Sequence, residues 1–450
     1  MKASAKMDMC TGPMLKKIIV FTIPIILSTV LQKLFTMADL VIVGQFCGSL
    51  SVGAVGSTNS LNTLFINLFI GLSVGGGVAV GNAVGAKDDN DIKKTVHTAI
   101  PFSVICGAIV SVLGVFLART MLELMGTPAD VLPLAVTYMQ IHFAGMIFNI
   151  IYNFGAAILR AVGDSKSPLY FLFISGVINV ILNVILVTLF DMDVAGVALA
   201  TSVSYAISAV LVILKLMKRD DACKLILSEM KLYSKPLKKM LLVGIPSGIQ
   251  STLFAISNVI IQSSVNSFGS IAISGNSAAS SIESFHYVLH NSFYQTALSF
   301  SAQNAGAKKY KRVKKTLIIC ALCATVLSLV SGALIYAFGP QLLSIYITDS
   351  KEAIRYGLER LAIFAFTYFL SGIQEIFTGT LRGLGNSIAP MIISVMGICV
   401  FRVFWIFVIF DMPQFHSLLW LFLSYPISWI LTIAALLVTF TIVYNRRKTA

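Results

Sequence analysis

An internal repeat at a spacing of 222 residues constrains the fold of this chain more than any other feature. The segment Leu159–Pro168 returns as Leu381–Pro390, and both copies follow the pattern Leu-Arg-x-x-Gly-x-Ser-x-x-Pro. The same shift relates Leu15–Pro24 to Leu237–Pro246. Transporters built from such repeats bind substrate and ions near the interface of the two copies. The repeat therefore predicts two similar lobes, with the chemistry at the positions where they differ.

The composition places these lobes in a membrane. Of the 450 residues, 57% are hydrophobic and only 12% are charged, whereas soluble domains carry about 25% charged residues. Apolar stretches of about 20 residues, the length that crosses a bilayer, recur along the chain. We therefore predict an all-α membrane protein with twelve transmembrane helices in two pseudo-symmetric six-helix lobes. The predicted spans are 16–45, 52–82, 95–117, 131–158, 168–190, 195–217, 239–266, 271–305, 316–338, 353–381, 390–410 and 417–444.

One long polar connection separates the sixth span from the seventh. Residues 218–238 are predicted to be a cytoplasmic linker between an N-terminal lobe, 1–217, and a C-terminal lobe, 239–450. The apolar run Leu225-Ile226-Leu227 within this linker could form a short helix on the membrane surface.

The net charge of +14 follows a membrane topology rather than a nucleic-acid surface. With the N-terminus inside, the inner segments hold 27 of the 33 Lys and Arg residues, and the outer segments hold Arg119, Lys351, Arg355 and Arg360. This bias places both termini in the cytoplasm, with the basic residues facing the anionic inner leaflet. We expect a multi-pass protein of the plasma membrane that contacts lipid and no nucleic acid.

Five charged residues fall well inside the apolar stretches, away from the ends of the predicted spans: Asp39, Glu283, Glu375, Lys33 and Arg402. Glu359, near the start of the tenth span, is ambiguous. Charge inside a bilayer is costly, so each of these residues marks a candidate functional site. The three acids and Arg402 have uncharged counterparts in the other half of the repeat. These counterparts are Ile261, Leu61, Asn153 and Val180. The scaffold is thus duplicated, while each candidate site belongs to one lobe.

Two charges of the second lobe are predicted to lie at similar depths. Glu375 lies 7 residues before Arg382, and Arg402 lies 12 residues after Pro390 on the other side of the same loop. At about 1.5 Å per residue the depths differ by roughly 7 Å, which an arginine side chain can span. We expect Glu375 to pair with Arg402, and Glu283 to stay free for a cationic substrate. The alternative is that Arg402 binds an anionic substrate.

Polar residues of the first lobe could surround Asp39. Asn179 and Asn183 are spaced i, i+4 and share one helical face, and Thr201 lies in the next span. Carboxylate, amide and hydroxyl oxygens bind small cations, and a proton would compete for the carboxylate. The alternatives are that the asparagines only tie helices together, or that Lys33 neutralises Asp39.

The eighth span contains Glu283-x-x-His286-x-x-x-His290. Glu-x-x-His is half of a dimetal signature of helical bundles, but the sequence has no second copy. We therefore predict no metal site, and the histidines could instead tune Glu283 or titrate near neutral pH. The sequence also has no phosphate loop or nucleophile elbow, so we predict no enzymatic activity. Because the sequence has no nucleotide-binding motif, we expect any transport to be driven by an ion gradient or by a separate partner protein, and not by ATP bound to this chain.

Three groups of residues resemble the multidrug and toxic compound extrusion (MATE) family over essentially the whole chain. The first is Ile23-Pro24 with Asp39 and Val43-Gly44, and the second is Gln303–Lys308 with Arg312-Val313. The paired Leu-Arg loops are the third. This resemblance implies a V-shaped pair of six-helix lobes and cation-coupled export of drugs or metabolites.

The resemblance also implies site residues. The similar branch uses an aspartate on span one, an Asn and an Asp on span five, and a threonine on span six. Asp39, Asn179 and Thr201 match, whereas Asn183 replaces the second acid and so favours proton over sodium coupling. Tyr138 matches an aromatic residue near that site. A span-seven glutamate of another branch is absent, and Gln250 is the nearest polar residue.

We therefore predict an antiporter that exchanges H⁺ or Na⁺ for a small molecule by alternating access. Its acids favour a lipophilic cation as substrate, and we expect a monomer with no cofactor besides the coupling cation. A flippase of lipid-linked precursors with the same two-lobe architecture, an intramembrane enzyme and a channel remain as alternatives. The predicted substrate pathway consists of Glu283, Glu375, Arg402, Gln250 and His286.

The charge bias makes a prediction about topology. Single cysteines at Asp191, Glu229 and Arg447 in a cysteine-free background should differ in their reaction with an impermeant thiol reagent added to intact cells. Asp191 lies in a predicted outer loop and should react, whereas the other two lie inside and should not. Labelling at Glu229 would contradict the predicted orientation.

Overall fold

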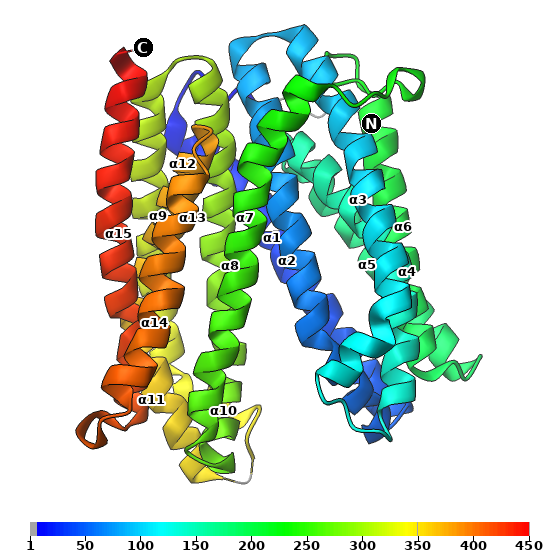
Figure 1. Cartoon of the computed structure of the whole chain (residues 1–450), viewed down its shortest axis with the longest axis vertical. Helices are drawn as coiled ribbons and strands as arrows, with labels where there is room; N and C mark the ends of the chain where they lie inside the picture. The colour runs from blue at the N-terminus through cyan, green and yellow to red at the C-terminus, as the bar shows by residue number, and fades with distance from the viewer. Residues whose placement is uncertain (1–6, 349, 450) are drawn as a thin grey trace. The chain divides into compact units, whose positions relative to one another are not determined.

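The computed structural model describes residues 7–348 and 350–449, and every regular element in these residues is a helix. Helices suit a hydrocarbon environment because each satisfies its own backbone hydrogen bonds. The chain divides into two compact units (Figure 1). Unit 1 comprises Ile23–Gly248 and a short segment that ends at Asp8, and unit 2 comprises Met9–Thr22 and the chain from Ile249 onward.

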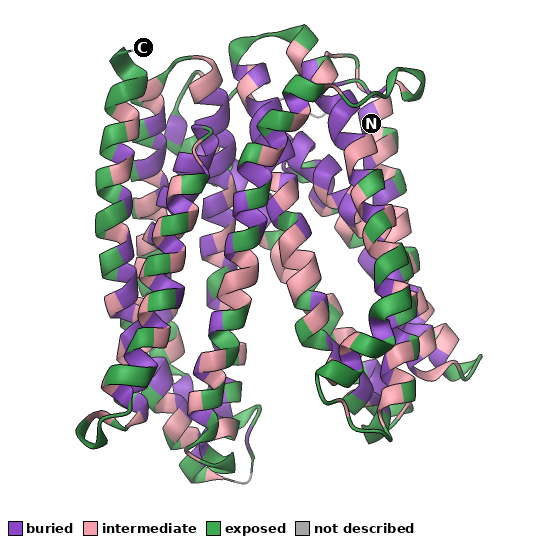
Figure 2. Cartoon of the chain, viewed as in Figure 1, coloured by how far each residue is buried: buried purple, intermediate pink, exposed green. Residues whose placement is uncertain are grey.

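The first half of the chain forms six long helices. Each buries some residues and exposes others (Figure 2), and the exposed ones include large apolar side chains such as Phe116, which is 79% exposed. Such a surface fits contact with lipid. The helices are α1 (Met14–Phe46), α2 (Ser49–Ala86), α3 (Asp89–Leu124), α4 (Leu132–Ala161), α5 (Lys166–Thr188) and α6 (Asp193–Met217).

The second half repeats this order with interruptions. Its tenth span is bent by 49° between two helices, and its eleventh contains two π-helical segments, η2 (Val395–Val400) and η3 (Trp405–Phe410). The α-helices are α7 (Ser234–Asn266), α8 (Ser270–Gly306), α9 (Tyr310–Ala337), α10 (Gly339–Ser344), α11 (Lys351–Thr367), α12 (Phe369–Gly383), α13 (Ile388–Ser394), α14 (Phe401–Phe404) and α15 (Leu418–Thr449).

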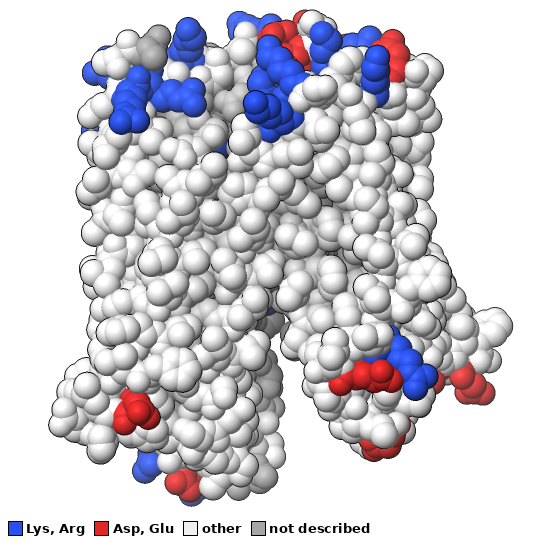
Figure 3. Space-filling view, viewed as in Figure 1, with Lys and Arg blue, Asp and Glu red and all other residues white. Residues whose placement is uncertain are grey.

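Among the described helices, ten are long and apolar enough to cross a membrane, and the bent pair α11 and α12 makes eleven. The remaining predicted span is α8, which has 37 residues and is more polar because it carries Glu283, His286 and His290. Figure 3 shows charged side chains near the ends of the helices in each unit, with largely uncharged surface between them. The prediction of an all-α membrane protein with twelve spans in two six-helix lobes is confirmed.

Two helices pass from one unit to the other, and each does so near a proline. Helix α1 enters unit 1 at Ile23, beside Pro24, and α7 enters unit 2 at Ile249, shortly after Pro246. A proline inside a helix removes one backbone hydrogen bond and favours a bend. The repeated prolines therefore mark where each crossing helix changes its packing partners. The predicted lobe boundaries follow the repeat and stay a prediction.

Glycines allow α2 to approach the first half of α7 within unit 1. A Cβ on Gly75 would overlap the carbonyl oxygen of Met240, and a Cβ on Gly71 would overlap the backbone of Gly248. Small residues permit this close packing of helix backbones in membranes.

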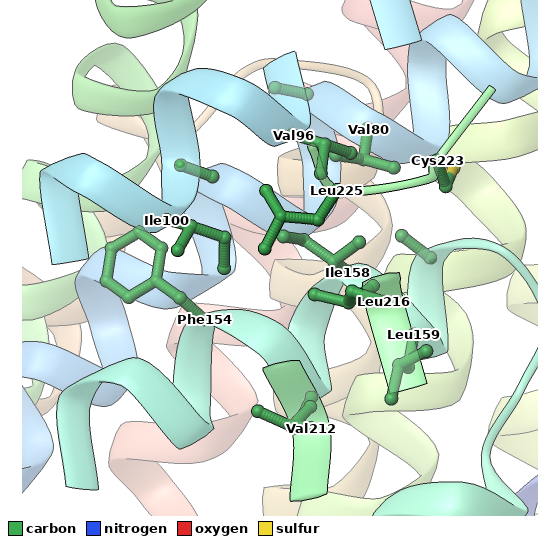
Figure 4. Packing of buried hydrophobic residues seen from close by; sticks show 14 of the residues in the cluster. Val80, Val96, Ile100, Phe154, Ile158, Leu159, Val212, Leu216, Cys223 and Leu225 are labelled. Atoms are coloured by element: carbon green, nitrogen blue, oxygen red, sulfur yellow. The ribbon is translucent and has the colours of Figure 1, made fainter. Parts of the chain in front are cut away.

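The largest core cluster of unit 1 includes a residue of the linker. Figure 4 shows Leu225 beside Val96 and Ile100 of α3, with Phe154 and Ile158 of α4 nearby. Leu225 is only 1% exposed, so the expectation that this run lies on the membrane surface is wrong at this position. The short helix of the linker is instead a 3-10 turn, η1 (Leu227–Glu229).

The repeated loop pattern ends one helix and starts the next. Gly163 and Gly385 have φ angles of 90° and 82°, a conformation that favours glycine. The side chains of Asp164 and Asn386 accept hydrogen bonds from backbone N–H groups three residues later, at 3.0 and 3.4 Å. These contacts satisfy free N–H groups at the start of a helix.

The motif around Asn304 holds the N-terminal segment within unit 2. Asn304 and Arg312 donate hydrogen bonds to the carbonyl oxygen of Met9 at 3.1 and 3.3 Å. Arg312 also donates to the carbonyl oxygen of Thr11 at 3.1 Å. These conspicuous polar residues therefore contribute to the fold of unit 2.

The contact between α2 and α7 can be tested by adding one methyl group. Gly75→Ala should destabilise the protein by about 1–3 kcal/mol, because the methyl overlaps Met240. Gly56, also in α2, has nothing within 4 Å of such a methyl. Gly56→Ala should therefore be neutral or stabilise by up to ~1 kcal/mol. Equal melting temperatures of the two variants in detergent would contradict the close contact.

Candidate functional site

A carboxylate of unit 1 lies among neutral polar groups from three helices. Asp39 of α1 is half-buried and accepts hydrogen bonds from Asn183 Nδ2 on α5 and from the Thr201 hydroxyl on α6. Asn183 Nδ2 also lies 3.4 Å from Asn179 Oδ1, and Asn179 Nδ2 lies 3.4 Å from Thr201 Oγ1. The structure therefore brings together the four residues of the predicted cation site.

This carboxylate has no fixed positive partner. Among the described residues, Asp39 makes no ion pair, and Lys33 does not approach it as a counter-charge. Asn183 Oδ1 is buried without a hydrogen-bond partner in the described part of the chain. A buried acceptor of this kind is normally satisfied by a proton donor or a cation. The site thus offers one formal negative charge and neutral oxygens, which suit a proton or a small monovalent cation.

Aromatic side chains adjoin the carboxylate. Tyr138 of α4 and Tyr205 of α6 are close enough to interact electrostatically with Asp39. The His142 ring centroid is 5.9 Å from both tyrosine rings, and neither of its nitrogens has a partner among the described residues. Tyr138 belongs to the predicted set. Tyr205 and His142 do not, because aromatic residues in apolar helices carry no signal that distinguishes a site from core packing.

In unit 2, Glu283 of α8 forms a bidentate ion pair with Arg360 of α11. Arg360 Nε and Nη2 each lie 2.7 Å from a carboxylate oxygen of Glu283, and Nη1 donates to Asn276 Oδ1 at 2.6 Å. Both charged residues are buried. The expectation that Glu283 stays free is therefore wrong. Arg360, assigned above to an outer segment, is a buried residue of α11 that neutralises this acid.

Arg402 also differs from its predicted role. It lies in α14, between the two π-helical segments, and its Nε donates to Ser428 Oγ on α15 at 3.0 Å. Its guanidinium lies 3.9 Å from the ring centroid of Tyr425 and 5.5 Å from that of Trp429. No ion pair joins Arg402 to Glu375 in the described residues. The depth estimate failed because it ignores the direction in which each side chain points around its helix.

Glu375 of α12 is half-buried and lies near polar residues of α12 and α8. It interacts electrostatically with Arg382, Tyr287 and Tyr294. Arg382 donates to the Tyr294 hydroxyl at 2.6 Å and to Gln250 Oε1 at 2.9 Å. Glu375 itself makes no ion pair within the described residues. Of Glu283 and Glu375, the two predicted membrane acids of unit 2, only Glu283 is paired with an arginine at contact distance in the described part of the chain. Gln250 belongs to the same surroundings as Glu375, because both interact with Arg382.

His286 and His290 of α8 face serines rather than other metal-ligating groups. His286 Nε2 lies 3.3 Å from Ser331 Oγ, and His290 Nε2 lies 2.8 Å from Ser328 Oγ. Both rings pack against Tyr368, with centroids 5.0 and 4.9 Å apart. Across the described residues, no group of three His, Cys, Asp or Glu side chains could hold a metal ion.

Comparison with known families and proteins gives consistent matches. The model of the MatE family matches this chain twice, over residues 24–185 and 246–408, which are the two halves of the repeat. The "probable multidrug resistance protein YoeA" of Bacillus subtilis is 29% identical over 385 residues, covering 84% of this chain and 83% of that protein. The "multidrug export protein MepA" of Staphylococcus saprophyticus is 22% identical over 380 residues, covering 84% and 83%.

Solved structures share the same fold. An outward-facing multidrug resistance MATE family transporter of the MOP superfamily superposes with a TM-score of 0.90 at 21% identity, over 100% of this chain and 99% of the other. A MOP superfamily transporter from Pyrococcus furiosus, described as having reverse polarity of its binding pocket, also gives a TM-score of 0.90 at 21% identity, with 99% of each chain covered.

The buried ion pair predicts effects of different size on stability for two matched substitutions. Glu283→Gln should destabilise the protein by about 3–5 kcal/mol, because it leaves the buried Arg360 without a counter-charge. Glu375→Gln should have little effect on stability, since Glu375 makes no ion pair in the described residues. Adding Arg360→Met to Glu283→Gln should recover most of the loss. Thermal unfolding measures all three, and an unchanged melting temperature for Glu283→Gln would contradict a structural role for the pair.

Proposed function

Because the chain belongs to the MatE family, we propose that it is an ion-coupled antiporter that exports drugs or metabolites across the plasma membrane by alternating access. The family is one of transporters rather than enzymes, and the chain is a multi-pass membrane protein. The names of the relatives from Bacillus and Staphylococcus support multidrug export. The flippase alternative has no comparable support.

The observation that carries this proposal is the carboxylate of Asp39 among neutral ligands. Asp39 binds the coupling ion in one state and releases it in another. In the structure Asn183 donates its Nδ2 hydrogen to Asp39, and the nearby oxygens Asn179 Oδ1, Asn183 Oδ1 and Thr201 Oγ1 are the neutral ligands that we assign to the ion. With a single carboxylate, the site exchanges one positive charge at a time. A proton and Na⁺ compete for it, and the missing second acid at Asn183 favours the proton.

The substrate is a small molecule, and we infer a lipophilic cation. Glu375 supplies a carboxylate that makes no ion pair in the described residues, and Tyr287 and Tyr294 supply aromatic surface beside it. A cation with apolar groups gains both charge attraction and contact with ring faces. Glu283 and Arg402 are already engaged within the fold, and their part is to support this pathway. The transporter acts as a monomer with both termini in the cytoplasm.

Asp39→Asn should keep the protein folded and reduce gradient-driven export at least tenfold, because the amide has a similar shape but cannot bind or release a proton. Asp411→Asn, the same change at an exposed position, is the matched control and should export normally. Both are measured in proteoliposomes with H⁺ and Na⁺ gradients imposed separately, which also identifies the coupling ion. Normal export by Asp39→Asn under both gradients would refute the assignment.

A further inference from the structure

The linker between α6 and α7 runs beside the start of α3 in unit 1 (Figure 1). Side chains of these two segments line a hollow. The hollow has a volume of about 430 Å³. It lies at an end of the helices where charged side chains gather (Figure 3), on the side where the bias in basic residues predicts the cytoplasm. The lining residues are Asn90, Lys93, Lys94, His97, Ser228, Glu229, Met230, Lys231 and Tyr233.

Hydrogen bonds from backbone N–H groups of the linker to His97 and Thr98 of α3 fix the path of the linker along this hollow. His97 of α3 is buried, and its Nε2 accepts a hydrogen bond from the backbone N–H of Ile226 at 3.0 Å. The backbone N–H of Lys231 donates to the carbonyl oxygen of His97 at 3.2 Å. The backbone N–H of Tyr233 donates to Thr98 Oγ1 at 3.1 Å. The lysines of α3 and of the linker are therefore held around the same space.

The lining carries more positive than negative charge. Lys93, Lys94 and Lys231 contribute three ammonium groups, and Glu229 contributes one carboxylate. The Nε2 of His97 is occupied by the backbone N–H of Ile226, so this ring does not offer a donor there. The hollow therefore attracts an anion, and the lysines, the Asn90 amide and the Ser228 hydroxyl offer donors to one with several oxygen atoms, such as a phosphate group.

Glu229 already places an anionic group beside one of these lysines. Its Oε2 lies 2.6 Å from Lys93 Nζ, and both side chains are largely exposed, at 42% and 48%. The hydrogen bond from Lys93 lowers the pKa of the Glu229 carboxyl, so the group is ionised at neutral pH. A carboxylate in this place competes with any external anion for Lys93.

Exposed apolar side chains of the linker lie next to the basic hollow. Leu227, Met230 and Leu232 are 50%, 39% and 41% exposed, although their neighbours Leu225 and Cys223 are buried in the core. Exposure of these three apolar side chains to water is unfavourable. Lipid acyl chains packed against them would remove them from water. Positive charge beside apolar surface at the cytoplasmic boundary matches the two parts of an anionic lipid.

We propose that this hollow binds the phosphate group of an anionic phospholipid of the inner leaflet, whose acyl chains cover Leu227, Met230 and Leu232. Glu229 occupies part of the phosphate site when no lipid is bound, and the lipid displaces it from Lys93. This site is separate from the candidate ion and substrate sites. It would attach the linker between the two halves of the repeat to the membrane surface.

The test uses the purified full-length protein in a neutral detergent, with short-chain phosphatidylglycerol as probe. Short-chain phosphatidylcholine and inorganic phosphate are the comparison ligands. Binding is measured by thermal stabilisation, as an apparent affinity for each ligand within each variant. A difference in basal stability between variants therefore does not enter the comparison. We expect the unmodified protein to bind phosphatidylglycerol at least tenfold more tightly than either comparison ligand.

Two substitutions should change this affinity in opposite directions. The triple variant K93Q/K94Q/K231Q should bind phosphatidylglycerol at least tenfold more weakly, because it removes the three positive charges that attract the lipid phosphate. E229Q should bind it severalfold more tightly, because Lys93 is released. The matched control K311Q/K314Q/K315Q removes the same charge from exposed lysines of α9 and should bind like the unmodified protein.

Four results would overturn the proposal. Equal loss of affinity in both triple variants would show non-specific attraction to a basic surface. Equal stabilisation by inorganic phosphate would show a general anion site that does not recognise lipid. Equal affinity for phosphatidylcholine would show that the headgroup charge has no part in binding. An E229Q affinity equal to or below that of the unmodified protein would contradict the competition between Glu229 and the lipid phosphate.

Discussion

A charge buried away from water must be stabilised by an opposite charge or by polar groups. The buried carboxylates of this protein differ in which of the two surrounds them. Glu283 has a fixed counter-charge in Arg360, which also donates to Asn276. The described surroundings of Asp39 contain only neutral groups: two asparagines, a threonine and two tyrosines. An acid paired with arginine is part of the scaffold, whereas an acid with neutral ligands needs a mobile cation. This difference is the reason for proposing Asp39, rather than Glu283, as the ion-coupling residue.

The duplicated residues and the unique residues have different tasks. Pro24 and Pro246 occur where α1 and α7 pass between the compact units, and Gly163 and Gly385 turn the chain between helices. Such positions solve the same folding problem in both halves, so the same residue types recur. The charged membrane residues have no repeat-related copies. The protein thus combines a symmetric helical scaffold with asymmetric chemistry, in which unit 1 holds the proposed ion site and unit 2 the proposed substrate contacts.

Helix positions and the residues around Asp39 could be predicted from the sequence, since hydropathy sets the spans and the i, i+4 spacing of Asn179 and Asn183 sets their common face. The sequence does not reveal the position of Arg360. It lies near the start of the predicted span 353–381, where charged residues can belong either to the outer segment or to the helix, and the structure places it buried in α11. The pairing of Glu375 with Arg402 failed because depth along a helix does not give direction around it. A bend of 49° within the tenth span and π-helical turns beside Arg402 change those directions, and hydropathy does not reveal them.

In the proposed exchange, the Asp39 carboxylate gives up its cation when substrate binds. The most direct measurement is ion release from the purified protein after addition of a transported lipophilic cation. Protons are followed in weakly buffered solution, and Na⁺ is followed by displacement of a radioactive tracer. The unmodified protein should release one of these ions, Glu375→Gln should release it only at higher substrate concentration, and Asp39→Asn should release neither. Release of the same quantity of ion by Asp39→Asn would contradict the account.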